Sequence, residues 1–178
     1  MKIIKTPIEG LKIKLNKVIG DRRGYLYELA PGGKDNEFLR DGIGNIYCST
    51  ATQRGIPRGG HYHEKLVENF FTISGLALWL FKDFRKKSST FGKAWGVILG
   101  EEEKINLPAS FPAYLLPYVM AQVWVPAGVY HVYYPLTSSK VIVLAVTSLP
   151  HDDSDYVRLL PDQDKDLKRL LEKVNFDK

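Results

Sequence analysis

Short runs of β-branched and aromatic residues, each bounded by glycine, proline or aspartate, recur along most of the chain. Nine of these runs predict strands, at residues 11–19, 24–29, 44–50, 69–75, 76–84, 93–99, 121–128, 129–136 and 140–146. They follow one another at roughly regular spacing, and no long amphipathic helix separates them, which is typical of a β-sandwich or a β-barrel. The pattern therefore predicts an all-β fold.

Helical periodicity begins only after Pro161. Four apolar residues then recur at helical spacing, with acidic residues in the first turn and a lysine near the end: Leu167, Leu170, Leu171 and Val174. This pattern predicts one C-terminal helix over about residues 162–174. We expect the helix to cap the sandwich or to contact a partner subunit, and we assign it no catalytic role.

The segment 107–118 contains prolines at positions 108, 112 and 117. Because proline cannot donate to a sheet ladder, this spacing disfavours a central strand. We predict an ordered surface connection here, with a lid or a dimer contact as the alternative.

Composition places the chain among globular proteins. Its 178 residues suit a single domain over 1–178, with 44% hydrophobic and 25% charged residues. The longest apolar stretch, 141–146, is far too short to span a bilayer, and the first residues contain no continuous apolar segment typical of a signal peptide. We therefore expect a cytoplasmic protein without a membrane span.

Cysteine content and charge restrict the possible ligands. The single cysteine, Cys48, excludes an internal disulfide and a cysteine-based zinc site, so a bound metal would need histidine and carboxylate ligands. The net charge of +5 is distributed, with local basic groups at 82–87 and 165–173. Neither group is a long basic tract with interleaved aromatic residues, so we expect no nucleic-acid partner. A small anionic substrate, such as a phosphorylated metabolite, fits this charge.

The most informative stretch is RGGHYHEKLVENFFTISG, residues 58–75. Because side chains alternate along a strand, His61, His63 and Lys65 should share one face. Polar groups that face a barrel interior cost free energy unless they serve a site, whereas the same groups on an outward face cost nothing. The pattern leaves two interpretations, a functional pocket or a solvent-exposed face.

The spacing of this stretch resembles the first of two signature segments of the cupin superfamily: His61, one residue, His63, four residues, Glu68, six residues, Gly75. The segment PAGVYH, which ends at His131, resembles the second as PxGxxH. The resemblance implies a cupin double-stranded β-helix, or jelly roll, whose interior is lined by His61, His63, Glu68 and His131. These side chains could bind a divalent metal or form a hydrogen-bonded acid and base set, and composition does not choose between the two.

Several segments also resemble the dTDP-4-dehydrorhamnose 3,5-epimerase family. They are GDRRGYLYEL, RGGHYH with the following KLV, KDFRKKSSTFGKAWGVILGEEEK and WVPAGVYHVYY. The paired histidines and the segment VLAVTSLPHDDSDYVR resemble the related sugar-nucleotide 3,4-ketoisomerases. Both resemblances imply a homodimeric isomerase that removes a proton next to the ketone of a nucleotide-linked 4-keto-6-deoxysugar, without a cofactor. The epimerase resemblance also implies a place in dTDP-rhamnose biosynthesis.

The same resemblance implies roles for individual residues. His61 matches the general base, and Lys65 would stabilise the enolate oxygen. Arg58 would contact the diphosphate, while Arg23 and Glu28 would contact the nucleotide. The alternatives are a surface ion pair between Arg23 and Glu28, an ordinary exposed arginine at position 58, and a lysine at position 65 that snorkels from the pocket rim. The full set of implied substrate-binding residues is Arg23, Glu28, Arg58, His63 and His131.

The chain departs from the epimerase pattern at the catalytic acid. The family's tyrosine would lie on the strand at 140–146, where Leu144 stands near the expected place. Ile46 and Cys48 stand near the positions of the side chains that would recognise thymine. Substitute acids would be Tyr130, Tyr133, Tyr134 or Tyr156. Carboxylate partners for the histidine would be Asp152, Asp153 or Asp155.

Two rival functions therefore stay open. One is a metal-dependent cupin, such as a sugar-phosphate isomerase or an oxygenase, that uses His61, His63, Glu68 and His131 as ligands. The other is a non-catalytic sugar-binding cupin. A 3,4-ketoisomerase remains the alternative within the keto-sugar enzymes.

Overall fold

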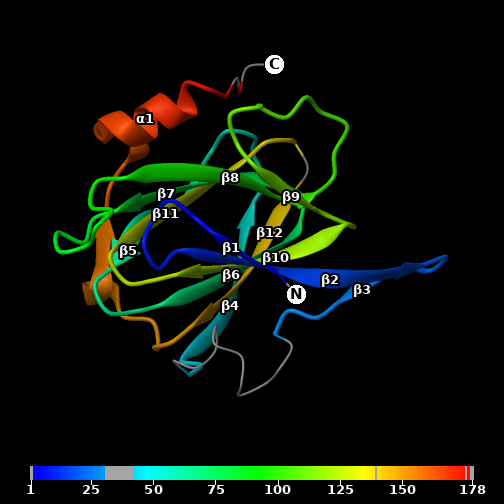
Figure 1. Cartoon of the computed structure of the whole chain (residues 1–178), viewed down its shortest axis with the longest axis horizontal. Helices are drawn as coiled ribbons and strands as arrows, with labels where there is room; N and C mark the ends of the chain where they lie inside the picture. Colours follow the sequence, from blue (N-terminus) through cyan, green and yellow to red (C-terminus); the bar gives the residue numbers. More distant parts are fainter. Residues whose placement is uncertain (1, 31–41, 139, 175, 177–178) are drawn as a thin grey trace.

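The computed structural model describes residues 2–30, 42–138, 140–174 and 176 (Figure 1). Its strands in this part of the chain are β1 (Lys2–Lys5), β2 (Lys12–Asp21), β3 (Gly24–Tyr27), β4 (Asn45–Ala51), β5 (Arg58–His63), β6 (Glu68–Ser74), β7 (Leu76–Asp83), β8 (Ala94–Glu101), β9 (Ala113–Leu116), β10 (Val119–Val125), β11 (Val129–Pro135), β12 (Val141–Thr147) and β13 (Tyr156–Arg158).

These strands form two sheets that pack on a shared core. One sheet has the order β1-β2-β10-β6-β12-β4, with β3 paired to β2, and the other has the order β13-β5-β11-β7-β8-β9. β8 and β9 pair in parallel, and the other recorded pairs, such as β5 with β11, are antiparallel. This is a jelly-roll sandwich, so the predicted all-β fold is confirmed.

All nine predicted segments form strands, and the histidine segment forms β5. The hydrophobic pattern does not anticipate β1, β9 or β13. β9 corrects the expectation of an unbroken connection over 107–118, because it pairs with β8 at the edge of the second sheet. A strand at an edge needs hydrogen bonds on one side only, so prolines can flank it.

β7 is buried on both faces because an apolar layer covers each side of its sheet. Trp79 and Phe81 pack in the core between the two sheets, whereas Leu78 and Leu80 pack in a second cluster on the outer face. All positions of β7 are buried. Burial on both sides explains why its sequence is a continuous apolar run rather than an alternating one.

The C-terminal helix covers this outer cluster. α1 (Lys165–Leu171) packs against β7 and β8, and it is shorter than the predicted range of 162–174 because a separate 3-10 turn, Pro161–Gln163, precedes it. Asp164 caps the helix by accepting two backbone N–H groups of the first turn, and its carboxylate lies 2.6 Å from the buried ammonium of Lys82. The helix therefore caps the sandwich, as predicted. Among the described residues, no helix is long and apolar enough to cross a membrane.

β2 and β3 form a hairpin that extends away from the body of the molecule (Figure 1). Two of its apolar side chains, Ile19 and Leu26, face each other across the hairpin and are 60% and 61% exposed. Exposure of paired large apolar side chains indicates a surface that a partner could cover.

Candidate active site

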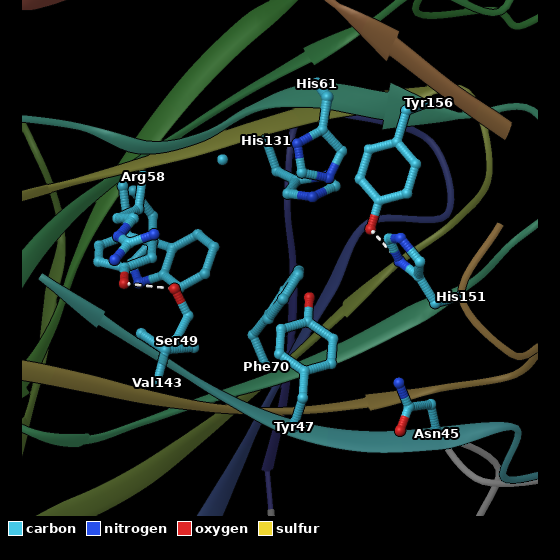
Figure 2. Close-up of a pocket in the computed structure, with 13 residues that line it drawn as sticks. Asn45, Tyr47, Ser49, Arg58, His61, Phe70, His131, Val143, His151 and Tyr156 are labelled. Carbon is cyan, nitrogen blue, oxygen red and sulfur yellow. Dashed lines mark hydrogen bonds between the residues drawn. The ribbon is translucent and has the colours of Figure 1, made fainter. Parts of the chain in front are cut away.

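A cavity of about 380 Å³ lies between the two sheets (Figure 2). Its volume falls in the range of small-molecule sites. Strands from both sheets contribute, so the cavity exists only when the sandwich has formed. Its lining residues are Asn45, Tyr47, Ser49, Arg58, Gly59, His61, Phe70, Trp79, His131, Tyr133, Val143, His151 and Tyr156.

Three neighbouring strands bring the histidines together. β5 lies between β11 and β13, so that His61 pairs with His131 on one side and His63 pairs with Tyr156 on the other. Gly59 lies beside a register shift in β11, at a φ of +89°. A Cβ atom there would lie 3.0 Å from the carbonyl oxygen of His131, so only glycine allows this close approach.

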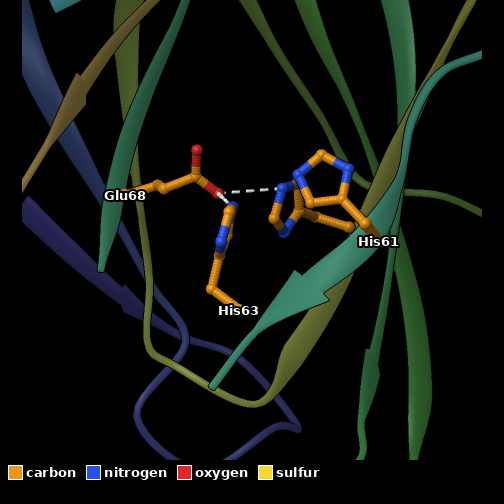
Figure 3. A group of neighbouring side chains, drawn as sticks. His61, His63 and Glu68 are labelled. Atoms are coloured by element: carbon orange, nitrogen blue, oxygen red, sulfur yellow. Dashed lines mark ion pairs between the residues drawn. The ribbon is translucent and has the colours of Figure 1, made fainter. Parts of the chain in front are cut away.

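The structure gathers His61, His63, Glu68 and His131 into one buried cluster. Their potential ligand atoms all lie within 4.8 Å of one another, although Glu68 comes from β6 in the opposite sheet. Figure 3 shows the Glu68 carboxylate facing the histidine rings, with Oε2 at 3.5 Å from His63 Nε2 and 2.9 Å from His131 Nε2. The shared interior that the cupin resemblance implies for these side chains is therefore present, and its donor atoms fit a divalent metal as well as an acid and base set.

Burial makes the imidazoles of β5 neutral. Desolvation, reinforced by the neighbouring His131, lowers the pKa of His61 to about 3, although the charge of Glu68 acts in the opposite direction. Desolvation also lowers the pKa of His63. For Glu68, burial acts to raise the pKa, but the three histidines outweigh it and hold the pKa below its usual value. Two neutral rings and a carboxylate are thus available to accept a proton or a cation.

The late carboxylate partner of the histidines is Asp155, and it faces His63 rather than His61. Its oxygens accept the backbone N–H groups of residues 64, 65 and 66, which hold the side chain in place. Oδ2 lies 3.4 Å from Nδ1 of His63. Of the three aspartates considered from the sequence, only Asp155 is buried.

The expectation that Lys65 shares the face of His61 and His63 is wrong. β5 ends at His63, the chain then bends, and Lys65 is exposed and does not line the cavity. Side-chain alternation applies only within a strand, so the period cannot be continued past its last residue. The role proposed for Lys65 at the enolate oxygen therefore has no support from its position.

The predicted nucleotide contacts also lie outside the cavity. Arg23 is in the turn of the β2–β3 hairpin, where its guanidinium pairs with Asp21 at 2.6 Å rather than with Glu28. Glu28 follows β3 and is exposed. Arg58 does line the cavity, and its Nε donates to the carbonyl oxygen of Thr50 at 2.9 Å, which holds the guanidinium at the mouth.

β12 presents an apolar side chain at the position where the epimerase resemblance implies a tyrosine. Val143, not Leu144, lines the cavity, because Leu144 faces a separate cluster on the other side of the sheet. The neighbouring strand β4 supplies two polar groups that the sequence did not indicate, Tyr47 and Ser49. Side chains alternate along a strand, and Ile46 of β4 is exposed, so the next residue, Tyr47, faces inward. This alternation is the sequence signal that places Tyr47 at the cavity.

Of the four tyrosines that the sequence offers as substitute acids, two reach the cavity. Tyr133 bonds to the hydroxyl of Ser49 at 2.8 Å, and Tyr156 lies beside the histidines. Tyr130 instead donates to the carbonyl oxygen of Leu159 and packs with Tyr134 in the outer cluster.

Tyr156 is the tyrosine closest to the imidazoles. Its ring centroid lies 4.6 Å from that of His61 and 4.3 Å from that of His63, and its hydroxyl lies 3.2 Å from His151 Nδ1 (Figure 2). Burial, together with the charge of Glu68, raises the pKa of Tyr156. The phenol therefore stays protonated near neutral pH and can donate a proton into the cavity.

Comparison with known proteins agrees with the fold and the sequence segments. The family model described as dTDP-4-dehydrorhamnose 3,5-epimerase matches residues 5–169. The chain is 26% identical to the dTDP-4-dehydrorhamnose 3,5-epimerase of Escherichia coli, over 87% of this chain and 77% of the relative. It is 28% identical to a spore coat polysaccharide biosynthesis protein of Bacillus subtilis, over 82% of this chain and 83% of the relative.

A solved structure also resembles this one in its fold. It is a dTDP-6-deoxy-D-glucose-3,5-epimerase of Legionella pneumophila in complex with dTDP-4-keto-L-rhamnose. The TM-score is 0.70 at 26% identity, with 89% of this chain and 77% of that chain covered.

Proposed function

Because the chain belongs to the dTDP-4-dehydrorhamnose 3,5-epimerase family, we propose that it isomerises a nucleotide-linked 4-keto-6-deoxysugar by moving a proton next to the ketone. One observation carries the proposal. A neutral imidazole, His61, and a protonated phenol, Tyr156, lie side by side on the wall of a cavity of small-molecule size. A base and an acid in contact with one bound sugar are what this reaction needs.

In the proposed reaction, His61 takes a proton from the carbon next to the ketone, and the electron pair of that C–H bond moves onto the ketone oxygen. The negative charge of Glu68 stabilises the imidazolium that forms. Tyr156 then gives its hydroxyl proton to a carbon of the enolate, which restores the ketone. The imidazolium and the phenolate exchange protons with solvent before the next turnover.

Arg58 is proposed to bind the diphosphate of the substrate. Its guanidinium is held at the mouth of the cavity by its bond to Thr50, and among the residues that the structure describes no other arginine or lysine lines the cavity. A guanidinium can bind two phosphate oxygens at once, which suits a diphosphate. The contact proposed between the nucleotide and Arg23 and Glu28 requires the hairpin to reach a substrate that is bound to another molecule, such as a second copy of the chain.

A sugar-nucleotide 3,4-ketoisomerase is the second candidate, and Val143 favours it. Inversion at two carbons needs a proton donor that reaches the sugar from the side opposite the base, and β12 offers an apolar side chain there. When only one proton is returned, whether to the original carbon or to the neighbouring carbon, a single donor near His61 is sufficient.

The remaining proposals concern the setting of the reaction. Enzymes of this family act without a cofactor, and the proton transfers proposed here use side chains alone. We also propose a homodimer, a cytoplasmic location and a single domain. A role in dTDP-rhamnose biosynthesis remains a prediction.

Deuterium exchange tests the proposed chemistry. The protein is incubated with dTDP-4-keto-6-deoxyglucose in deuterated water, and deuterium in the sugar is located by NMR. We expect incorporation at C3 or C5, and we expect His61→Ala to abolish it while Tyr62→Phe, a change on the same strand but in the outer cluster, retains it. Failure to exchange any proton of this or other nucleotide keto sugars would contradict the proposal.

A further inference from the structure

Two basic segments that are far apart in the sequence, 82–87 and 165–173, meet on one side of the folded molecule (Figure 1). α1 packs against β7 and β8, and the loop that joins these two strands carries the first segment. A hollow of about 300 Å³ lies where the loop meets the helix. Three of its lining side chains are cationic, Lys93, Arg169 and Lys173, and one is acidic, Asp166.

The face of α1 that points away from the sheet is basic. Its leucines pack in the outer cluster, and Leu167 has no exposed surface. Because a helix turns once every 3.6 residues, the positions between the leucines share the opposite face. The one acidic residue of the helix, Asp166, bonds to the ammonium of Lys82, which offsets its charge. The exposed positions of the outward face are Lys165, Lys168 and Arg169.

The loop between β7 and β8 holds an aromatic ring outward among lysines. The hydroxyls of Ser88 and Thr90 turn inward and donate to the buried carboxylate of Asp83, at 2.6 Å each. The backbone N–H of Gly92 donates to the carbonyl oxygen of the same aspartate. These bonds fix the loop, so that Phe91 faces solvent and is 54% exposed. The lysines at positions 86, 87 and 93 are also exposed.

Positive charge predominates on this side of the molecule. We define the basic surface as Phe91 together with the exposed cations of 86–93 and of 165–173. Its acidic neighbours are fewer than its cations, and one of them, Glu9, accepts bonds from Ser88 and Ser89. Glu172 is the other exposed acid beside the helix. A single exposed ring is ordinary on a protein surface, but a ring held outward among cations is a combination that fits a particular partner.

We propose that the basic surface docks the protein on an anionic phospholipid membrane. Lysine and arginine side chains are attracted to anionic headgroups, and an aromatic side chain enters the boundary between the headgroups and the acyl chains. The hollow lined by Lys93, Arg169 and Lys173 is placed to hold a lipid phosphate. A free polyanion would use the charge alone, whereas a membrane uses both the charge and the projecting ring.

This inference does not rest on the proposed function. Among the described residues, none that forms the basic surface lines the cavity between the two sheets. Vesicles that bind the protein are therefore expected to leave the deuterium exchange unchanged.

Vesicle flotation tests the docking. The full chain is mixed with vesicles of phosphatidylcholine and phosphatidylglycerol in a two-to-one ratio, or of phosphatidylcholine alone, and the bound fraction is measured at low and at physiological salt. We expect binding to the anionic vesicles only, and weaker binding as salt rises, because ions screen charges that face solvent. Equal binding to both kinds of vesicle, or binding to neither, would overturn the proposal.

Paired substitutions locate the surface. Lys86→Gln combined with Lys87→Gln should weaken binding to the anionic vesicles about 25-fold, since each cation near such a surface contributes about five-fold. The matched control, Lys2→Gln combined with Lys140→Gln, changes exposed lysines next to β1 and β12 of the other sheet and should bind as the unmodified chain does. Equal weakening in both pairs would show that net charge alone drives the association, and it would overturn the proposal.

The ring is tested separately. Phe91→Ser should weaken vesicle binding roughly 10-fold, because the substitution removes the apolar surface that leaves water. Ile56→Ser is the control, since Ile56 is 57% exposed on the connection between β4 and β5. Circular dichroism verifies that each variant is folded. Unchanged binding in Phe91→Ser would contradict insertion of the ring and overturn the membrane assignment.

Two further results distinguish the proposals from their rivals. Saturable binding of inorganic phosphate in a calorimetric titration, without vesicle binding, would indicate a site for a free anion and overturn the docking surface. Vesicle binding without any deuterium exchange would support the docking surface and contradict the proposed isomerase. Deuterium exchange by a protein that binds no vesicle would support the isomerase and overturn the docking surface.

Discussion

At the scale of single residues, burial sets the chemical state of each group on the cavity wall. Desolvation lowers the pKa of His61 to about 3 and raises the pKa of Tyr156. Near neutral pH the imidazole is therefore uncharged and the phenol is protonated, so one group accepts and the other donates. Neighbouring charges make smaller or opposing contributions, as Glu68 does at His61.

We predict that Tyr156→Phe lowers kcat while leaving KM nearly unchanged. The substitution keeps the ring that packs against His61 and His63 but removes the hydroxyl that returns the proton. Loss of a general acid typically costs about 10²- to 10⁴-fold in rate. Steady-state kinetics with the nucleotide keto sugar measures both constants.

Tyr62→Phe is the matched control for this prediction. Tyr62 lies on the same strand as the histidines, but its ring stacks on Phe84 in the outer cluster. We expect its kinetics to match those of the unmodified chain. A Tyr156→Phe variant with unchanged kcat would exclude this tyrosine as the acid.

At the scale of elements, the turn between β7 and β8 is held by one buried carboxylate. Asp83 has no exposed surface and accepts bonds from the Arg85 guanidinium and from the hydroxyls of Ser88 and Thr90. These residues belong to the segment whose sequence resembles the epimerase family. None of them lines the cavity, and the bonds that they make hold the turn between β7 and β8.

We predict that Asp83 makes the protein sensitive to acid. Burial acts to raise the pKa of Asp83, but the bonds from Arg85, Ser88 and Thr90 hold it well below the usual 3.8. A group whose pKa is depressed in the folded state stabilises the fold above its unfolded pKa, and this contribution disappears as pH falls through the folded value. The free energy of unfolding should therefore decline steadily below about pH 4.

Urea unfolding at a series of pH values tests the role of Asp83. Asp83→Asn should be less stable than the unmodified chain at pH 7, because it loses the charged bonds to Arg85, and its stability should decline less on acidification. Asp162→Asn changes an exposed carboxyl and should follow the unmodified chain. Equal acid sensitivity in Asp83→Asn and the unmodified chain would contradict the assignment.

At the scale of the whole molecule, the projecting hairpin is the clearest candidate for contact with a second copy. Ile19 and Leu26 expose more than half of their surfaces and face each other across β2 and β3. Covering such side chains gains roughly 25 cal/mol per Å² of apolar area removed from water. The homodimer that the family resemblance implies would use this surface.

We predict that Leu26→Asp shifts the protein from dimer to monomer. A carboxylate at an apolar interface loses hydration without gaining a partner, which disfavours association. Leu160→Asp is the control, because Leu160 is also 61% exposed but lies far along the chain, after β13. Sedimentation velocity distinguishes the species, and an unmodified chain that sediments as a monomer would contradict the prediction.

The sequence by itself determined the elements and part of the site. Alternating and continuous apolar runs predicted nine strands, because the two-residue period of a strand is a local property. The same period placed His61 and His63 on one face. Local rules suffice for these statements because each concerns residues within one strand. That Glu68 and His131 share an interior with them was implied only by the resemblance to the cupin signature segments.

Only the tertiary structure decided which groups meet. Lys65 leaves the site because β5 ends two residues earlier, and Asp155 reaches His63 because β13 pairs with β5. Tyr47 and Val143 enter the cavity through the register of β4 against β12, and a shift of one residue would exchange Val143 for Leu144. Strand ends and the register between distant strands depend on how the sheets pack, and no local period encodes them.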